Sequence, residues 1–172
     1  MNLQSTDFEL FGVPERFAQD RAALDARWKE LQGEAHPDRF ASQGAAAQRV
    51  ALQWSVRINE AYQRLKDPLR RAAYLCERHG APVDAENNTA MPAEFLMRQM
   101  EWREALDEVD GLPALDRLSD EVQAERKHTL ELLAHRLDAQ HDYAAAAQLV
   151  RALMFIARFA SDIETRYERL GQ

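Results

Sequence analysis

Few of the 172 residues carry side chains whose types and spacing could support catalysis or metal binding. Four of the five histidines are scattered (His79, His128, His135 and His141), and the last two lack the i, i+4 spacing of a helical metal pair. The single cysteine, Cys76, excludes an internal disulfide and a site built from several thiolates. No glycine-rich phosphate loop occurs, and no nucleophile lies near a paired base. The sequence therefore predicts no enzyme, no metal site and no cofactor.

The fifth histidine lies in the one stretch where such side chains gather, Ala35-His36-Pro37-Asp38-Arg39-Phe40. A proline restrains the residue before it to extended conformations, so the preceding helix should end near His36. Asp38 can bond to nearby backbone N–H groups in an Asx-turn. We therefore expect His36, Asp38 and Arg39 at an exposed tip between two helices. By themselves these residues also fit a simple helix terminator.

Two amphipathic helices are expected to hold this tip. The first should run from about Arg21 to Ala35 with Asp20 as its N-cap. The second should run from about Ala45 to Leu65, after a loop from Phe40 to Gly44. Apolar residues at helical spacing predict the buried stripes, which are Leu24, Trp28 and Leu31, then Val50, Trp54, Ile58, Ala61 and Leu65. The two helices would form an antiparallel hairpin with the tip at its hinge.

The flanking segments carry a resemblance to a known family. A short apolar turn, Phe8-Glu9-Leu10-Phe11-Gly12, precedes the hairpin, and Ile58-Asn59-Glu60-Ala61-Tyr62 and Leu65-Lys66-Asp67-Pro68 follow the tip. Together with His36-Pro37-Asp38 they resemble a J-domain. A third helical pattern from Leu69 to about Arg78 contains Arg70-Arg71-Ala72-Ala73-Tyr74-Leu75, with Gly80 five residues on, and is similar to the HscB type of co-chaperone. The resemblance covers the whole chain.

The resemblance implies a role for the tip. In such co-chaperones the loop docks on a DnaK-type chaperone, here of the HscA kind, and stimulates its ATP hydrolysis. His36, Pro37 and Asp38 would act as protein contacts rather than as catalytic groups, and Arg39 matches the basic residue that usually follows. J-domains also use a basic face on the preceding helix, for which Arg27 and Lys29 are well placed. Acidic residues on the same helix dilute this charge, which would make docking weak or selective for one chaperone.

The second half follows a polar, turn-rich linker from Ala81 to Met91. We therefore expect a J-domain over residues 1–80 and a second domain over residues 92–172. The first 80 residues carry 12 basic and 11 acidic side chains, whereas residues 81–172 carry 10 and 18. This asymmetry suggests two modules with different partners.

The first helix of this half should run from Pro92 to about Asp110, capped by Thr89 or Asn88. Its predicted buried stripe is Phe95, Trp102, Leu106 and Val109. Another face interleaves apolar and acidic residues, namely Leu96, Met97, Met100, Glu101, Glu104 and Glu108. This second face could pack under a neighbouring helix, but unpaired carboxylates favour an exposed partner-binding patch. Metal ligation by these glutamates is not favoured, since no Glu-x-x-His motif accompanies them.

Two more helices complete the predicted all-α fold, an N-terminal J-domain helical hairpin plus a C-terminal three-helix antiparallel bundle. They should run from about Ala114 to Ala139 and from about Asp142 to Leu170. The buried stripe of the last helix is predicted to include Leu149, Leu153, Ile156, Ala160, Ile163 and Tyr167, with Phe155 outside it.

The HscB resemblance implies that the mixed face binds the iron–sulfur cluster scaffold protein IscU. The contacts would be Leu96, Met97, Met100, Glu101, Glu104 and Glu108, and Phe155 aligns with an aromatic contact from the last helix. The alternative is a J-protein that recruits a general DnaK-type chaperone to another client. It is disfavoured because the chain lacks a Gly/Phe-rich linker and a cysteine-rich client domain.

Other classes of partner are not expected. The acidic second half disfavours nucleic-acid binding. No signal peptide is apparent, and no stretch approaches the roughly 20 apolar residues that span a bilayer, so no membrane partner is expected. We expect a cytoplasmic protein, with import after removal of a transit sequence as the alternative.

Overall fold

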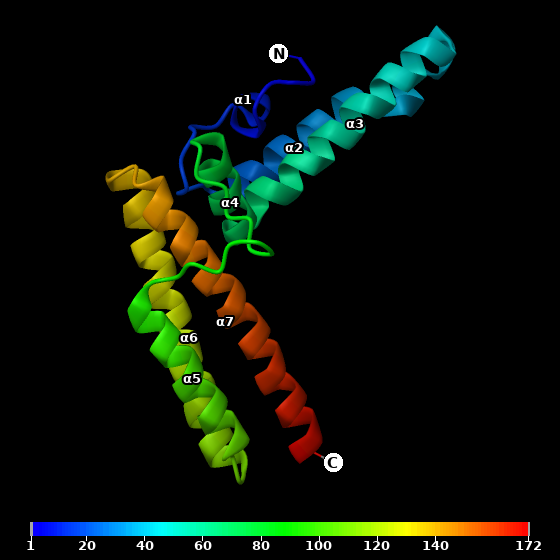
Figure 1. Ribbon diagram of the computed structural model, residues 1–172. Helices are drawn as coiled ribbons and strands as arrows, with labels where there is room; N and C mark the ends of the chain where they lie inside the picture. Colours follow the sequence, from blue (N-terminus) through cyan, green and yellow to red (C-terminus); the bar gives the residue numbers. More distant parts are fainter. Residues whose placement is uncertain (1, 172) are drawn as a thin grey trace. The chain divides into compact units, whose positions relative to one another are not determined.

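The computed structural model describes residues 2–171, and within this range every regular element is helical. The all-α fold class predicted from the sequence is therefore correct. The chain divides into two compact units, Met1–Leu75 and Cys76–Gln172, which are described in turn (Figure 1). The domain limits predicted at residues 80, 81–91 and 92 stay a prediction.

The first unit is built on two long helices, α2 (Arg21–Ala35) and α3 (Ala45–Lys66). Asp20 caps α2 as predicted, because its side chain accepts a hydrogen bond from the amide of Ala22 at 3.0 Å. Trp28 of α2 stacks on Tyr62 of α3 with ring centroids 4.9 Å apart. The helices lie side by side as the predicted antiparallel hairpin (Figure 1).

Most of the predicted stripe residues of the hairpin are buried or half-buried, with Leu24, Leu31, Ile58 and Leu65 in the core. Val50 is the exception, since 52% of its surface is exposed. The prediction for Val50 was wrong because this part of α3 borders an open groove instead of a filled core.

A short helix, α1 (Asp7–Phe11), is tied to the hairpin by a buried ion cluster. The fully buried carboxylate of Asp7 lies 2.8 Å from Arg57 and 2.6 Å from Arg64, both on α3. The hydrogen bond to Asp7 raises the pKa of Arg64. Two cations compensate the buried carboxylate, which otherwise would be strongly destabilising in the core. Gly12 ends α1 with a φ of 64°, a left-handed conformation that favours glycine.

Helix α4 (Pro68–Arg78) begins after Asp67, whose side chain accepts from the amide of Leu69 at 3.0 Å. Its residue Arg71 is buried and donates to the carbonyls of Phe17 and Leu65. These bonds fasten the segment before α2 and the end of α3 to the start of α4.

The second unit is a three-helix antiparallel bundle of α5 (Ala93–Asp107), α6 (Leu112–Ala134) and α7 (Tyr143–Leu170), seen in green, yellow and orange in Figure 1. Two details differ from the sequence prediction. Helix α5 has no side-chain cap, and the side chain of Asn88 instead accepts from the amide of Ala90 within the linker. Residues His135–Ala139, predicted as part of one long helix, form a single π-helical turn (η2) with Leu137 buried.

Helix α7 is the core helix of this bundle. Ten of its residues are buried, including Leu153, Ile156 and Ile163 of the predicted stripe. By length and composition it is also the one helix within residues 2–171 that could cross a membrane, with a window of mean hydropathy 1.3 that is 56% buried. The prediction that no stretch approaches the length and hydropathy of a membrane span was therefore wrong. The core helix of a folded domain can have the length and hydropathy of a membrane span. Because α7 is buried in the bundle, its apolar composition is explained by its place in the core.

Candidate functional site

The predicted tip lies between α2 and α3. His36 ends α2 in an extended conformation, as expected for a residue that precedes proline. Its Nδ1 accepts a hydrogen bond from the amide of Asp38 at 3.2 Å. The side chains of His36 and Asp38 are 56% and 93% exposed. The tip therefore presents an imidazole and a carboxylate to solvent, in a geometry fixed by Pro37 between them.

The segment after the tip is more ordered than predicted. Residues Pro37–Gln43, expected in part as loop, form a 3₁₀ helix (η1) that starts with Pro37. Arg39 turns back and donates from Nη1 to the carbonyl of Gly33 at 2.9 Å. This bond satisfies one of the free carbonyls at the C-terminus of α2 and anchors the tip. Arg39 thus has a structural contact in addition to the predicted partner contact.

The face of α2 beside the tip has mixed charge. Arg27 pairs with Glu30 at 3.1 Å and is partly buried, whereas Lys29 is exposed and forms no ion pair within the described residues. Arg21 pairs with Asp25 at 2.9 Å at the start of α2, at the opposite end of the helix from the tip. Lys29 is therefore the better placed of the two predicted cations to attract an acidic partner surface.

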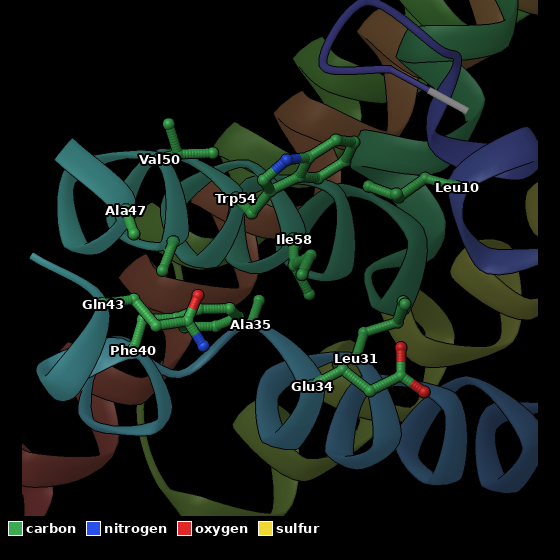
Figure 2. Close-up of a pocket in the computed structure, with 11 residues that line it drawn as sticks. Leu10, Leu31, Glu34, Ala35, Phe40, Gln43, Ala47, Val50, Trp54 and Ile58 are labelled. Carbon is green, nitrogen blue, oxygen red and sulfur yellow. The ribbon is translucent and has the colours of Figure 1, made fainter.

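An apolar groove of about 590 Å³ opens between the hairpin helices behind the tip. Phe40 and Gln43 of η1 line it together with Ala47, Val50 and Trp54 of α3 (Figure 2). Glu34 is the one charged residue in the lining. Three small residues, Ala35, Ala47 and Ala51, also belong to the lining, and their short side chains leave space that larger ones would fill.

The second predicted surface lies on α5. Its buried side, Phe95, Trp102 and Leu106, packs into the bundle. The six predicted contact residues, five on α5 and its C-cap Glu108, are all exposed, among them Leu96 at 46%, Met97 at 67% and Met100 at 69%. No ion pair is recorded among residues 2–171 for the three glutamates of the set, Glu101, Glu104 and Glu108. We call these six residues the α5 face.

Phe155 of α7, also predicted as a contact, belongs to an aromatic cluster and remains half-buried. Its ring centroid lies 5.8 Å from Phe95, 6.5 Å from Trp102 and 5.9 Å from Phe159. Because two of these neighbours come from α5, the packing brings Phe155 next to the helix that carries the α5 face.

Three residues of this region were missed in the sequence analysis. Phe159 is fully buried, and a signal for it was available, since it follows Ile156 by three residues and precedes Ile163 by four. Arg103 pairs with Asp162 at 2.7 Å and covers the rings of Phe155 and Phe159. Arg151 is buried and donates to three carbonyls of the linker. No sequence pattern marks such contacts between distant elements.

No metal centre is evident in the part of the chain that the structure describes, since no three histidine, cysteine or carboxylate side chains gather there. Cys76 is buried, and burial raises the pKa of its thiol to about 11. The tip and the α5 face expose charged and apolar side chains that suit recognition of other molecules through shape, charge and apolar contact.

Comparison with known proteins gives consistent matches. A family model described as the HSCB C-terminal oligomerisation domain matches residues 91–164. A curated relative, the co-chaperone protein HscB homolog of Burkholderia multivorans, is 48% identical over 173 residues, which covers 99% of this chain and 98% of that protein.

Solved structures match as well. The chaperone HscB from Vibrio cholerae is 38% identical with a TM-score of 0.81, covering 96% of this chain and 99% of that one. The human co-chaperone protein HscB is 25% identical with a TM-score of 0.84, covering 97% of this chain and 84% of the human one.

Proposed function

Because this chain belongs to the HscB co-chaperone family, we propose that it brings an iron–sulfur cluster scaffold protein of the IscU type to a chaperone of the HscA type and stimulates the chaperone's ATPase. The tip formed by His36, Pro37 and Asp38 would contact the chaperone. The α5 face and Phe155 would bind the scaffold. The protein itself would perform no chemistry on a substrate and hold no cofactor, and it would act in the cytoplasm.

The observation that carries this proposal is the presence of two exposed recognition surfaces on one chain of this family. The tip is exposed and conformationally fixed, as a protein contact requires. The α5 face combines three exposed apolar side chains with three carboxylates, an arrangement typical of an interaction patch. A partner that matches it would offer apolar side chains surrounded by lysine or arginine.

The contacts assigned to the chaperone also include Arg27, Lys29 and Arg39. Lys29 is exposed and unpaired within residues 2–171, which supports a role in attracting the chaperone. Arg27 would first have to leave Glu30, and Arg39 already holds Gly33. We therefore expect Lys29 to contribute most to the association rate, in a salt-dependent manner.

The test of the proposal is steady-state ATP hydrolysis by the HscA-type chaperone with the scaffold present. The unaltered protein should stimulate turnover, and His36→Gln should abolish the stimulation while leaving scaffold binding intact. His128→Gln, which changes another exposed histidine on α6, is the matched control and should stimulate fully. If His36→Gln stimulates normally, the tip is only a helix terminator and the proposed chaperone contact is wrong.

The scaffold half of the proposal is tested in the same assay and by calorimetry. Leu96→Ala combined with Met97→Ala should weaken scaffold binding by about tenfold or more, since a few central apolar contacts dominate such interfaces. Leu112→Ala removes an equally exposed leucine, 51% exposed at the start of α6, and should have no effect. Unchanged binding by the double variant would reject the α5 face as the scaffold site and favour a different client.

A further inference from the structure

We propose that Arg103 is a positioning residue of the scaffold-binding surface, because it holds the ring of Phe155 beside the α5 face. This inference rests on the function proposed above. Arg103 is absent from the contacts that the family resemblance implies, and only the packing of α5 against α7 reveals what it touches.

Arg103 lies at the edge of the α5 face. It follows Leu96 by seven residues and Met100 by three, so at 100° per residue it lies within about 60° of both around the helix. Its side chain is 51% exposed, and it reaches towards α7, where its Nη1 donates to the carboxylate of Asp162 at 2.7 Å. The guanidinium is therefore fixed on one side by α5 and on the other by an ion pair with α7.

The fixed guanidinium lies against two aromatic rings. Its Cζ is 5.6 Å from the ring centroid of Phe155 and 5.2 Å from that of Phe159, within the range of a cation–π interaction. The planar guanidinium suits this position better than an ammonium group, since it stacks on a ring and pairs with a carboxylate at the same time. Asp162, Arg103 and Phe155 thus form a chain of contacts across the two helices.

The contact with Arg103 restrains the ring of Phe155, which the scaffold would meet. Phe155 packs on Phe95, Trp102 and Phe159 within the bundle, and Arg103 adds a contact at the half-exposed part of the cluster. A ring already held in its bound orientation loses less conformational entropy when a partner docks. Exclusion of water by the docked partner would also strengthen the interaction between Arg103 and the ring. Arg103 should therefore increase affinity mainly by slowing dissociation.

The test compares scaffold binding by Arg103→Met, Arg103→Lys and Arg98→Met, measured by calorimetry with the purified cluster-free scaffold. Arg98 is the matched control, because it lies on the same helix about 140° from Arg103 around the axis and forms an ion pair with Glu125 of α6 instead of a contact with Phe155. We expect Arg103→Met to weaken binding roughly three- to tenfold, Arg103→Lys to restore part of the affinity, and Arg98→Met to bind as the unaltered protein does. Thermal unfolding of each variant shows whether the two ion pairs affect stability to a similar extent.

A double-mutant cycle with Phe155→Leu shows whether Arg103 acts through the ring. If it does, adding Arg103→Met to Phe155→Leu should lower the affinity for the scaffold little beyond the effect of Phe155→Leu alone. The inference is overturned if Arg103→Met binds the scaffold normally while Phe155→Leu does not, or if Arg98→Met loses as much affinity as Arg103→Met. It is also overturned if the fold-losses in affinity of Arg103→Met and Phe155→Leu multiply in the double variant. If Phe155→Leu and the Leu96 and Met97 substitutions all leave binding unchanged, the proposed scaffold site itself fails.

Discussion

The hydroxyl of Tyr62 donates a hydrogen bond of 2.6 Å to Asp25, and Arg21 pairs with the same carboxylate. These interactions hold the pKa of Asp25 below its ordinary value, with the hydrogen bond from Tyr62 as the larger cause. Because the folded-state pKa is lowered, the contribution of Asp25 to stability is present above its unfolded pKa. It is lost as the pH falls through the folded value.

Replacing Tyr62 by phenylalanine should therefore raise the pKa of Asp25 towards its ordinary value near 4. NMR titration of the Asp25 side chain measures this change directly. The difference in stability between the variant and the unaltered protein should be constant near neutral pH and should disappear in acid. Tyr167→Phe removes a similar bond to Asp116 in the second unit and serves as control. An unchanged Asp25 pKa in Tyr62→Phe would contradict the assignment of the hydrogen bond as its main cause.

At the scale of elements, the linker before α5 is held by one side chain of α7. Arg151 is 5% exposed, and its guanidinium donates to the carbonyls of Val83 at 2.8 Å, Ala90 at 3.0 Å and Pro82 at 3.2 Å. Five N–H donors in a planar fork allow one arginine to satisfy several carbonyls at once. The linker is therefore an ordered segment fastened to the bundle, although its composition is typical of a loop.

Arg151→Met should lower the free energy of unfolding by about 3 kcal/mol, because the carbonyls of the linker lose their buried donors. Hydrogen exchange should show faster exchange over residues 81–91, and chemical denaturation gives the loss of stability. Arg158→Met changes an exposed arginine of the same helix and should have little effect on either measurement. Equal effects of the two substitutions would contradict the role assigned to Arg151.

At the scale of the whole molecule, the proposal requires both surfaces on one chain, since the chaperone and the scaffold must meet on the same co-chaperone. A mixture of His36→Gln with the Leu96→Ala, Met97→Ala double variant tests this requirement. Each variant retains the surface that the other lacks. We expect the mixture to stimulate the ATPase in the presence of the scaffold no more than the sum of the stimulations that the two variants give separately.

The control is the unaltered protein at half the total concentration, which should stimulate because each molecule carries both surfaces. Recovery of full stimulation by the mixture would mean that the two surfaces act independently. In that case the protein would activate the chaperone without delivering the scaffold to it.

The sequence by itself determined the helices and the exposed tip. Helical periodicity and caps are properties of neighbouring residues, so Asp20 and Pro37 defined where the helix before the tip begins and ends without reference to the rest of the chain. The same periodicity separated the buried side of α5 from the α5 face, which is exposed as expected. The 3₁₀ helix after the tip and the π-helical turn at 135–139 were not predicted, since small changes in hydrogen-bond register leave little trace in the residue pattern.

Only the tertiary structure decided which distant side chains meet. Val50 has the spacing of a core residue but is exposed, because it lines an open groove between α3 and the segment after the tip. Arg103 and Arg151 are ordinary surface residues by composition, and their roles depend on an ion pair 59 residues away and on carbonyls more than 60 residues away. Residue spacing along one helix sets which way a side chain points, whereas its partner is set by how the helices pack.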